Sequence, residues 1–560
     1  MAATLIDDVN DIIGLVKDNE TNSVFRTDMC EVKKSEFGGL GVYAKEDIEE
    51  GTSLLKVHKS ILFSANNCSI GNLLHEEGIG GMLGLNIAFI YEITVFKEKS
   101  FWYNYLKSIR FLDEDGVLLL PPSHWEESDK KLLRGSSVDL LYGALDPEVE
   151  IQEGFEIAID LSIKWNQELN LNIPEGFLDV NITDIDDIRE KLKKFVSVAF
   201  ALSSRVFEVD AYHENALVPI ADLFNHNSEK TDVRFVSVFD VCAECGEFGP
   251  CKHDEIDEVA EEGADNDEEV QEVEGSGNFN ALVKQLEEEV EDRCTEREDS
   301  TMSDETYVEI VLAKAVKEGD EIFNSYGDLN NSLLLSRYGF AYLDNKNDMV
   351  DLSLQLHDVV NSDKKYQIRL KWWSDVGYTL YESWYKLNRE EAEKSEGEEE
   401  DDDGEDEDDE DDEEHEEDTH EHEHEHVHGE GCSRDHGSNV LNELYVDFDC
   451  TPSRNLNALI NILSLDDNKY DKLTSSLEQD TETPPQFVTT IFDTFDQFNT
   501  SNKAISNTNQ NIKLLKQLLQ LKKPHPLPTN KTAISEHQLQ QVKTLLQNEN
   551  TLIRNMSTKL

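Results

Sequence analysis

The amino-acid sequence predicts an α+β protein in which small antiparallel β-sheets are combined with long helical segments. Three observations carry this prediction. Between residues 30 and 63, short apolar runs alternate with glycine-containing turns at 38–41 and 50–51, a pattern typical of hairpins. Between 70 and 215, apolar residues recur at helical spacing. Helical spacing dominates again beyond residue 350, where a long acidic tract interrupts it.

The net charge of -70 is concentrated in two acidic segments. Residues 254–305 carry 22 acidic and 3 basic residues, and residues 390–430 carry 27 acidic residues and 1 basic residue. Because the rest of the chain has ordinary apolar patterning, the sequence describes a globular protein with two acidic insertions rather than an acidic coil. The acidity argues against direct binding to nucleic acid and favours a basic protein partner, such as a ribosomal protein or a histone.

The expected parts of the chain are, in order, an N-terminal helix (1–25), a mixed domain (26–345) with a helical insert (70–215) and an acidic insertion (242–305), and an all-helical domain formed by 350–389 and 438–560. Residues 390–437 have a composition that cannot bury a core, so we expect them to be disordered.

The cellular setting is predicted from features that the sequence lacks. No charged-then-apolar leader opens it, so we expect a reducing compartment, the nucleus or the cytoplasm, and no disulfides among the eight cysteines. The longest apolar stretch, 82–95, contains Asn86 and Glu92 and is too short and too polar to span a bilayer. We therefore expect no membrane association, and we expect a monomer.

Polar residues end two apolar runs. Asn225 and His226 follow residues 217–224 (LVPIADLF), and Tyr326 follows residues 321–323 (EIF) after a short polar step. Polar atoms at the end of a buried segment need partners, and a ligand with amino, carboxylate and purine groups would supply them. The alternative is that these side chains are polar groups satisfied within the core, with no chemistry.

Seven short motifs follow one another along the chain: GGLGVYA at 38–44, PPSHW at 121–125, LLRGS at 132–136, SRVF at 204–207, PIADLFNH at 219–226, EIFNSYG at 321–327 and SRYGF at 336–340. This ordered set resembles the SET-domain protein-lysine methyltransferases, in particular the branch of the Rubisco large-subunit methyltransferase and the fungal ribosomal-protein lysine methyltransferases. The resemblance implies a SET fold in which the segments of Asn225 and Tyr326 cross in a knot-like arrangement, an exception to the rule that chains do not thread.

The resemblance also implies a function, the S-adenosylmethionine-dependent methylation of a lysine on a basic protein, most naturally a ribosomal or translation-related one. The alternatives are histone methylation, or a non-catalytic binding protein or chaperone for ribosomal proteins or histones. By position, Tyr326 is the expected catalytic residue, and Arg205, Asp222 and Tyr338 are expected on the substrate side. The expected cofactor contacts are Gly38, Gly39, Leu40, Gly41, Arg205, Asn225, His226 and Tyr326.

A separate cluster, Cys242, Cys245, Cys251 and His253, lies at the start of the first acidic insertion. Three thiols and an imidazole are the ligand types of a tetrahedral zinc site, and the alternative is a loop with surface cysteines. Alternating histidines at 420–428 have the chemistry for weak metal binding, and the alternative there is a solvated acidic tract.

Overall fold

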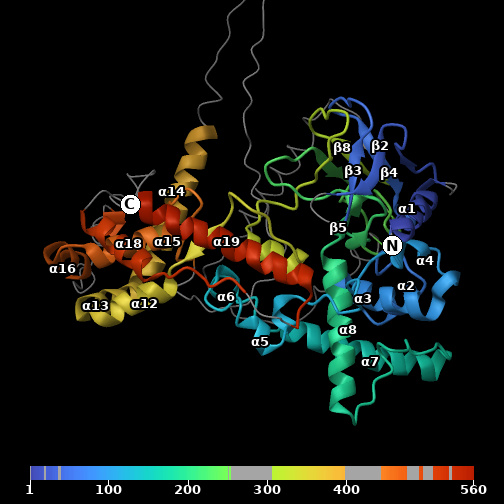
Figure 1. The fold of residues 1–560 in the computed structure, drawn as a ribbon, viewed down its shortest axis with the longest axis horizontal. Coiled ribbons are helices and arrows are strands. Elements are labelled where there is room, and N and C mark those ends of the chain that lie inside the picture. The colour runs from blue at the N-terminus through green and yellow to red at the C-terminus, as the bar shows by residue number, and fades with distance from the viewer. Residues whose placement is uncertain are drawn as a thin grey trace, which may run out of the picture. The chain divides into compact units, whose positions relative to one another are not determined.

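The computed structural model describes residues 2–17, 21–35, 39–249, 251–253, 306–397, 443–475, 491–492, 494–495, 509–528 and 533–559. The chain divides into two compact units, Met1–Leu119 with Val149–Tyr326, and Leu120–Glu148 with Gly327–Leu560 (Figure 1). This division differs from the predicted one. Residues 120–148, expected within the helical insert of the mixed domain, belong to the second unit, and the first unit ends at Tyr326 rather than near residue 345.

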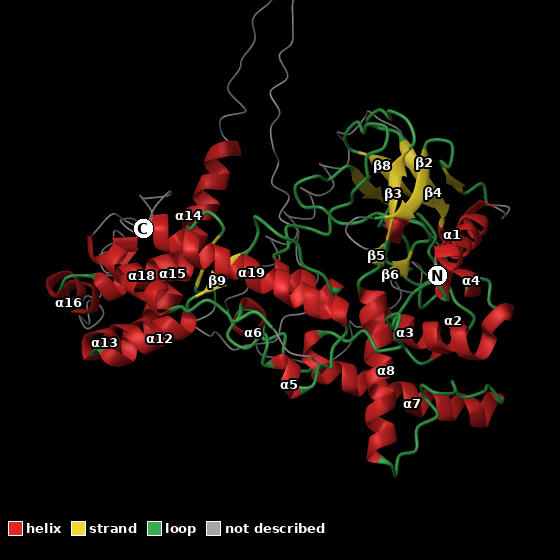
Figure 2. Cartoon of the chain, viewed as in Figure 1, coloured by secondary structure: helices red, strands yellow, loops and turns green. Residues whose placement is uncertain are grey.

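The first unit contains the four-stranded sheet and two of the two-stranded sheets, and Figure 2 shows its strands gathered beside α1. Its strands are β1 (Val24–Phe25), β2 (Cys30–Lys34), β3 (Leu40–Ala44), β4 (Ser53–His58), β5 (Val206–Glu208), β6 (Asn215–Leu217), β7 (Val233–Val236) and β8 (Tyr307–Leu312). Its helices are α1 (Ala2–Lys17), α2 (Gly71–Glu76), α3 (Gly81–Tyr91), α4 (Tyr103–Leu106), α7 (Val149–Leu169) and α8 (Ile185–Ser203).

The central sheet of this unit is antiparallel, with strand order β1-β4-β8-β7, and two separate hairpins pair β2 with β3 and β5 with β6. Alternation along β8 buries Val308, Ile310 and Leu312 in the core. The prediction of small antiparallel sheets is therefore confirmed. The N-terminal prediction is corrected, because the helix ends at Lys17 and β1 already pairs with β4.

Local sequence explains two of the helices of this unit. α8 begins where the Asp184 carboxylate accepts hydrogen bonds from the backbone N–H groups of Asp186 and Asp187, the usual role of an N-cap aspartate. Every residue of α3 from Gly84 to Tyr91 is buried, as expected for a helix that is apolar on all sides. Within the part of the chain that the structure describes, no helix combines the length and the apolar character needed to cross a membrane.

The second unit is mainly helical. Its helices are α5 (Glu127–Lys130), α6 (Ser137–Leu140), α11 (Asn331–Leu333), α12 (Ser353–Ser362), α13 (Lys364–Trp372), α14 (Tyr378–Gly397), α15 (Arg454–Ser464), α16 (Asp467–Ser475), α18 (Asn509–Leu521) and α19 (Glu536–Lys559). The expectation of an all-helical domain is wrong in one respect, because β9 (Met349–Asp351) pairs with β10 (Tyr445–Asp447). Helix α14 continues to Gly397, so the first residues of the tract 390–437 are helical, and the rest of that tract lies outside the described residues.

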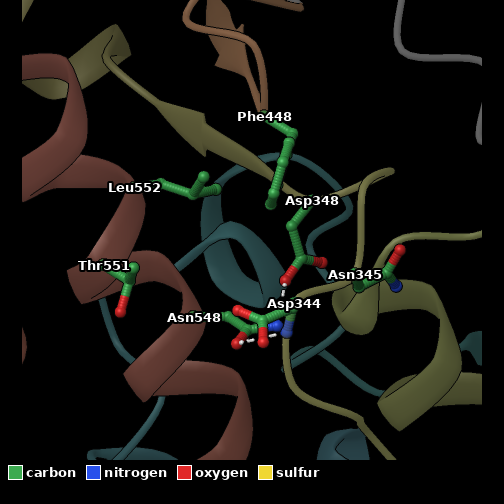
Figure 3. A pocket seen from close by; sticks show the side chains of 7 residues that line it. All are labelled: Asp344, Asn345, Asp348, Phe448, Asn548, Thr551 and Leu552. Atoms are coloured by element: carbon green, nitrogen blue, oxygen red, sulfur yellow. Dashed lines mark hydrogen bonds between the residues drawn. The ribbon is translucent and has the colours of Figure 1, made fainter. Parts of the chain in front are cut away.

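A buried carboxylate joins three elements of the second unit around a small pocket (Figure 3). Asp348 accepts hydrogen bonds from the backbone N–H of Asn331 at 2.7 Å, from the Asn331 side chain at 2.7 Å and from the Asn548 amide on α19 at 2.9 Å. Burial raises the pKa of Asp348 to about 7 although these three donors lower it. Asp348 is therefore a group whose protonation couples to folding.

We expect the stability of the second unit to fall as pH rises from about 4 to about 7, by at most about 4 kcal/mol, because folded Asp348 retains a proton there that the unfolded residue has lost. Asp348→Asn should flatten this dependence. Peptide-resolved hydrogen exchange of α19, compared between variant and wild type at each pH, measures it. The exposed neighbour Asp344→Asn is the matched control. Equal pH dependence in wild type and Asp348→Asn would contradict the assignment.

Candidate active site

The segment from Asp320 to Asn324 brings the three sequence motifs together. On one side it pairs with β3, where Ala44 N–H donates to the Asp320 carbonyl at 2.9 Å and Ile322 N–H donates to the Val42 carbonyl at 2.8 Å. On the other side Asn324 N–H donates to the Asn225 carbonyl at 2.8 Å, and a parallel bridge joins His226 to Asn324. The glycine-rich turn, the Asn-His motif and the tyrosine motif therefore occupy neighbouring strands of backbone.

The carboxylate of Glu321 organises the turn side of this site. Glu321 is 8% exposed and accepts hydrogen bonds from the hydroxyl of Tyr43 at 2.7 Å, the hydroxyl of Ser35 at 3.0 Å and the amide of Asn225 at 2.7 Å. The same Asn225 amide donates to the Leu40 carbonyl at 3.0 Å. Asn225 is thus held between the turn and Glu321, so its side chain fixes the protein's own backbone.

Gly41 is required for this arrangement on steric grounds. A Cβ atom at position 41 would lie 2.1 Å from Glu321 Oε1 and 3.0 Å from Asn225 Nδ2. Although a glutamate tip is normally free to move, here three hydrogen bonds hold it. The missing side chain at Gly41 therefore makes room for Glu321.

We expect Gly41→Ala to lower the free energy of unfolding by about 1–3 kcal/mol through overpacking against Glu321. In a Glu321→Ala background most of this penalty should disappear, because the atoms in conflict are gone. Urea unfolding of the two single variants and the double variant gives the coupling energy. Additive losses would show that Gly41 does not serve this contact.

His226 positions Tyr326. The Tyr326 backbone N–H donates to His226 Nδ1 at 2.9 Å, and the two rings stack with centroids 5.0 Å apart. An Nδ1 that accepts this bond places the proton of the neutral imidazole on Nε2. The Tyr326 hydroxyl in turn donates to the carbonyl of Phe224 at 3.3 Å. Tyr326 is thereby fixed at its backbone and at its hydroxyl by residues of one motif.

Arg205 and Asp222 form a charged pair, with Arg205 Nη1 3.3 Å from Asp222 Oδ2. The Asp222 side chain is 3% exposed and the Arg205 side chain 34% exposed. Burial raises the pKa of Asp222, and the guanidinium opposes this shift. The buried hydroxyl of Tyr105 faces the same carboxylate, and burial raises its pKa well above the ordinary value. The structure thus brings together two of the three residues expected on the substrate side.

The remaining predicted residues take no part in the contacts described so far. Tyr338 belongs to the second unit, where its ring packs edge-on against Phe340 at 6.3 Å, and its role stays a prediction. Gly38 lies outside the described residues, while Gly39 adopts a left-handed conformation (φ 65°), and a Cβ atom there would meet no atom of the described residues within 4 Å. The four ligating atoms of the cysteine–histidine cluster lie within 4.8 Å of one another.

The sequence-based prediction missed Glu321, Tyr43 and Tyr105. For Glu321 the signal was present. Side chains two residues apart in an extended segment point to the same face. Glu321 therefore shares a face with Phe323, which is buried. A carboxylate on that face needs donors, and Tyr43 lies in the adjacent glycine-rich motif. Tyr105 carried no local signal, because its neighbourhood forms only through contacts distant in sequence.

Strained backbone precedes the Asn-His motif. Ile220 is buried and has φ 76°, a conformation that β-branched residues rarely adopt. Such a residue persists only where the surrounding structure fixes it, and strain of this kind concentrates at functional sites. The strained position lies directly before the segment that carries Asp222, Phe224 and Asn225.

Comparisons with known proteins support a methyltransferase site. No protein-family model matches the chain. The chain is 48% identical over 406 residues to ribosomal lysine N-methyltransferase 3 of Saccharomyces cerevisiae, a match that covers 71% of this chain and 73% of that protein. It is 25% identical over 353 residues to N-lysine methyltransferase setd6 of Xenopus laevis, with 59% of each protein covered.

Among solved structures, the SET domain of LSMT bound to lysine and AdoHcy aligns with a TM-score of 0.45 and 14% identity, over 99% of this chain and 91% of that one. The sequence relation to the yeast enzyme is the stronger finding, since it extends over most of both proteins. Together with the ordered motifs and the site they form, it shows that the chain belongs to the SET-domain protein-lysine N-methyltransferases.

Proposed function

We propose that this methyltransferase uses S-adenosylmethionine as its methyl donor and a ribosomal protein as its substrate. One observation carries the proposal of a methyl-transfer site, namely the convergence of the Gly39–Gly41 turn, Asn225, His226 and Tyr326 on the segment 320–324. The parallel bridge between His226 and Asn324 also supports the proposed knot-like crossing.

The residues present fit such a donor. Gly39 leaves open space beside the turn, and the next carbonyl, that of Leu40, is bonded to the Asn225 amide. Backbone without side chains lets a ligand approach closely. In this proposal the backbone of the turn and of Asn225 and His226 holds the amino-acid and adenine parts of the donor. The donor supplies a methyl group already activated by its sulfonium, so positioning is the main task of the protein.

In this proposal Tyr326 positions the lysine. Its hydroxyl is fixed by the Phe224 carbonyl, so its oxygen has a defined place from which to orient an incoming amine and to make weak CH···O contacts. The amine must first lose a proton, since the pKa of a free lysine is about 10.4. Partly apolar surroundings lower that pKa, and the mechanism requires no dedicated base. Arg205, Asp222 and Tyr338 are proposed to contact the substrate.

Two observations favour a ribosomal protein as the substrate. The relative that is 48% identical is a ribosomal lysine N-methyltransferase, and the net charge of -70 attracts basic proteins. We further propose that the protein acts as a monomer in the nucleus or cytoplasm. Histones are the second basic class that this charge would attract.

Labelling identifies the substrate directly. The purified protein is incubated with methyl-labelled S-adenosylmethionine and an extract from cells that lack it, and the labelled bands are identified by mass spectrometry. We expect label on a lysine of a ribosomal protein. Label confined to histones would replace the substrate class, and the absence of label on any protein would contradict the proposal.

A further inference from the structure

The segment that leads from β7 toward residues 254–305 contains Cys242, Cys245, Cys251 and His253, none of which takes part in the site described above. With bond lengths of about 2.3 Å to sulfur and about 2.0 Å to nitrogen, ligand atoms around a tetrahedral zinc ion lie about 3.5–3.8 Å apart. His253 Nδ1 lies 3.4 Å from Cys242 Sγ and 3.6 Å from Cys251 Sγ. These two distances match such a site, and all four ligand atoms lie within 4.8 Å of one another.

The backbone of this segment is arranged around the sulfur atoms. Gly246 N–H donates to the Cys242 carbonyl at 2.7 Å, which closes a tight turn over the first two cysteines. His253 N–H donates to the Cys251 sulfur at 3.4 Å, and Cys242 N–H donates to the Glu247 carbonyl at 2.9 Å. Donors aimed at sulfur stabilise thiolates, as the surroundings of metal-bound cysteines do.

No hydrophobic core holds this segment in place. Among the described residues from 237 to 253 none is buried, and Phe239 and Phe248 are 52% and 50% exposed. A loop without buried side chains does not gather three thiols and an imidazole through packing, whereas a metal ion provides that folding energy directly. An ordinary surface loop with scattered cysteines, the alternative considered above, does not account for the convergence.

The segment is attached to the loop 209–214 of the first unit. A Cβ atom at Gly246, which has φ 72°, would lie 3.0 Å from the Tyr212 ring. Ala211 N–H donates to the Phe239 carbonyl at 3.3 Å, and Lys59 Nζ donates to the Val238 carbonyl at 2.9 Å while pairing with Asp210 at 2.8 Å. A metal at the cysteines would therefore fix the start of the acidic insertion to the body of the first unit.

We propose that Cys242, Cys245, Cys251 and His253 bind one zinc ion. The site has four protein ligands and no open position, so it is structural rather than catalytic. Its role is to hold the first residues of the insertion against the loop 209–214. The ion is independent of methyl transfer, and its loss leaves Tyr326 and its partners in place.

Metal analysis of the untagged full-length protein tests the site. We expect one zinc per chain in the wild type, and loss of that zinc in Cys245→Ser and in Cys251→Ser. Cys450→Ser, which removes a partly exposed cysteine of the second unit, should retain it. A variant with the five histidines of 420–428 replaced by glutamine should also retain it. Zinc at trace level in the wild type, or zinc that follows the histidines instead, would overturn the proposal.

Thiol protection gives a test that needs no variant. In the untreated protein we expect iodoacetamide to modify Cys242, Cys245 and Cys251 slowly, and a strong chelator to accelerate all three together. Hydrogen exchange of the peptide spanning 237–249 should increase under the same treatment. Fast modification of all three thiols before chelation would contradict a bound zinc ion.

Discussion

Tyr326→Phe is expected to reduce methyl transfer by at least about 100-fold while leaving the fold intact, because a preorganised hydroxyl at a reacting centre contributes on that scale. The ring remains and continues to stack on His226, so stability should change little. Initial rates with saturating donor and substrate measure the effect, and circular dichroism checks the fold.

The matched control is Tyr307→Phe. The Tyr307 hydroxyl also donates to a backbone carbonyl, that of Thr21 at 2.6 Å, and it lies on β8 of the same unit. We expect this variant to keep full activity. If Tyr326→Phe were as active as Tyr307→Phe, the Tyr326 oxygen would have no part in aligning the lysine, and the residue would be structural.

The second large effect is expected from the pair Asn225→Ala and His226→Ala. The first change removes the donor shared by Glu321 and the Leu40 carbonyl, and the second removes the acceptor for the Tyr326 N–H. Both the turn and the tyrosine segment lose their fixed places. We expect the dissociation constant for S-adenosylmethionine to rise at least about tenfold, equivalent to about 1.4 kcal/mol, as measured by calorimetric titration.

A control pair separates this effect from a general loss of stability. Asn86→Ala with His213→Ala removes a buried asparagine and a histidine that is 8% exposed, the same fraction as His226. His213 pairs with Asp210, away from the motif residues. The control pair should lose stability but bind the donor normally once folded. Unchanged donor affinity in Asn225→Ala/His226→Ala would exclude these residues from the donor site.

Elements with strong local signals could be predicted from the sequence. Helix α15 extends over Arg454–Ser464, because an apolar face follows Ser453, whose hydroxyl accepts the Leu456 N–H. Helix α8 begins at Ile185, directly after the capping Asp184. In such elements propensity, capping and amphipathic spacing agree with one another.

Relations between distant segments could not be predicted. Residues 120–148 belong to the second unit because of contacts such as that of Ser137 N–H with Glu549 Oε1 at 2.8 Å, across 412 residues of chain. The local spacing of apolar residues gives no signal for such a contact. Likewise the guanidinium of Arg454 lies 4.1 Å from the ring centroid of Tyr385, a contact between residues 69 positions apart that local spacing does not indicate.

Within the site, the motifs identified which segments meet. They did not identify which side chains bind the ligand and which hold the surrounding backbone. Asn225 and His226 were expected to contact the donor largely through backbone groups, which stays a prediction, and their side chains fix Leu40, Glu321 and Tyr326. Residue type alone does not distinguish a polar group that binds a ligand from one that holds the backbone around it. The hydrogen-bond partners make that distinction, and they appear only in the folded chain.

The central claim is that the turn at Gly39–Gly41, the Asn-His motif and Tyr326 together form the donor site. Ultraviolet cross-linking of labelled S-adenosylmethionine to the full-length protein, followed by peptide mapping, tests it most directly. We predict label in peptides that carry these three segments, suppressed by excess S-adenosylhomocysteine and lost in the Asn225→Ala/His226→Ala pair. Label confined to other peptides, and competed in the same way, would contradict the account.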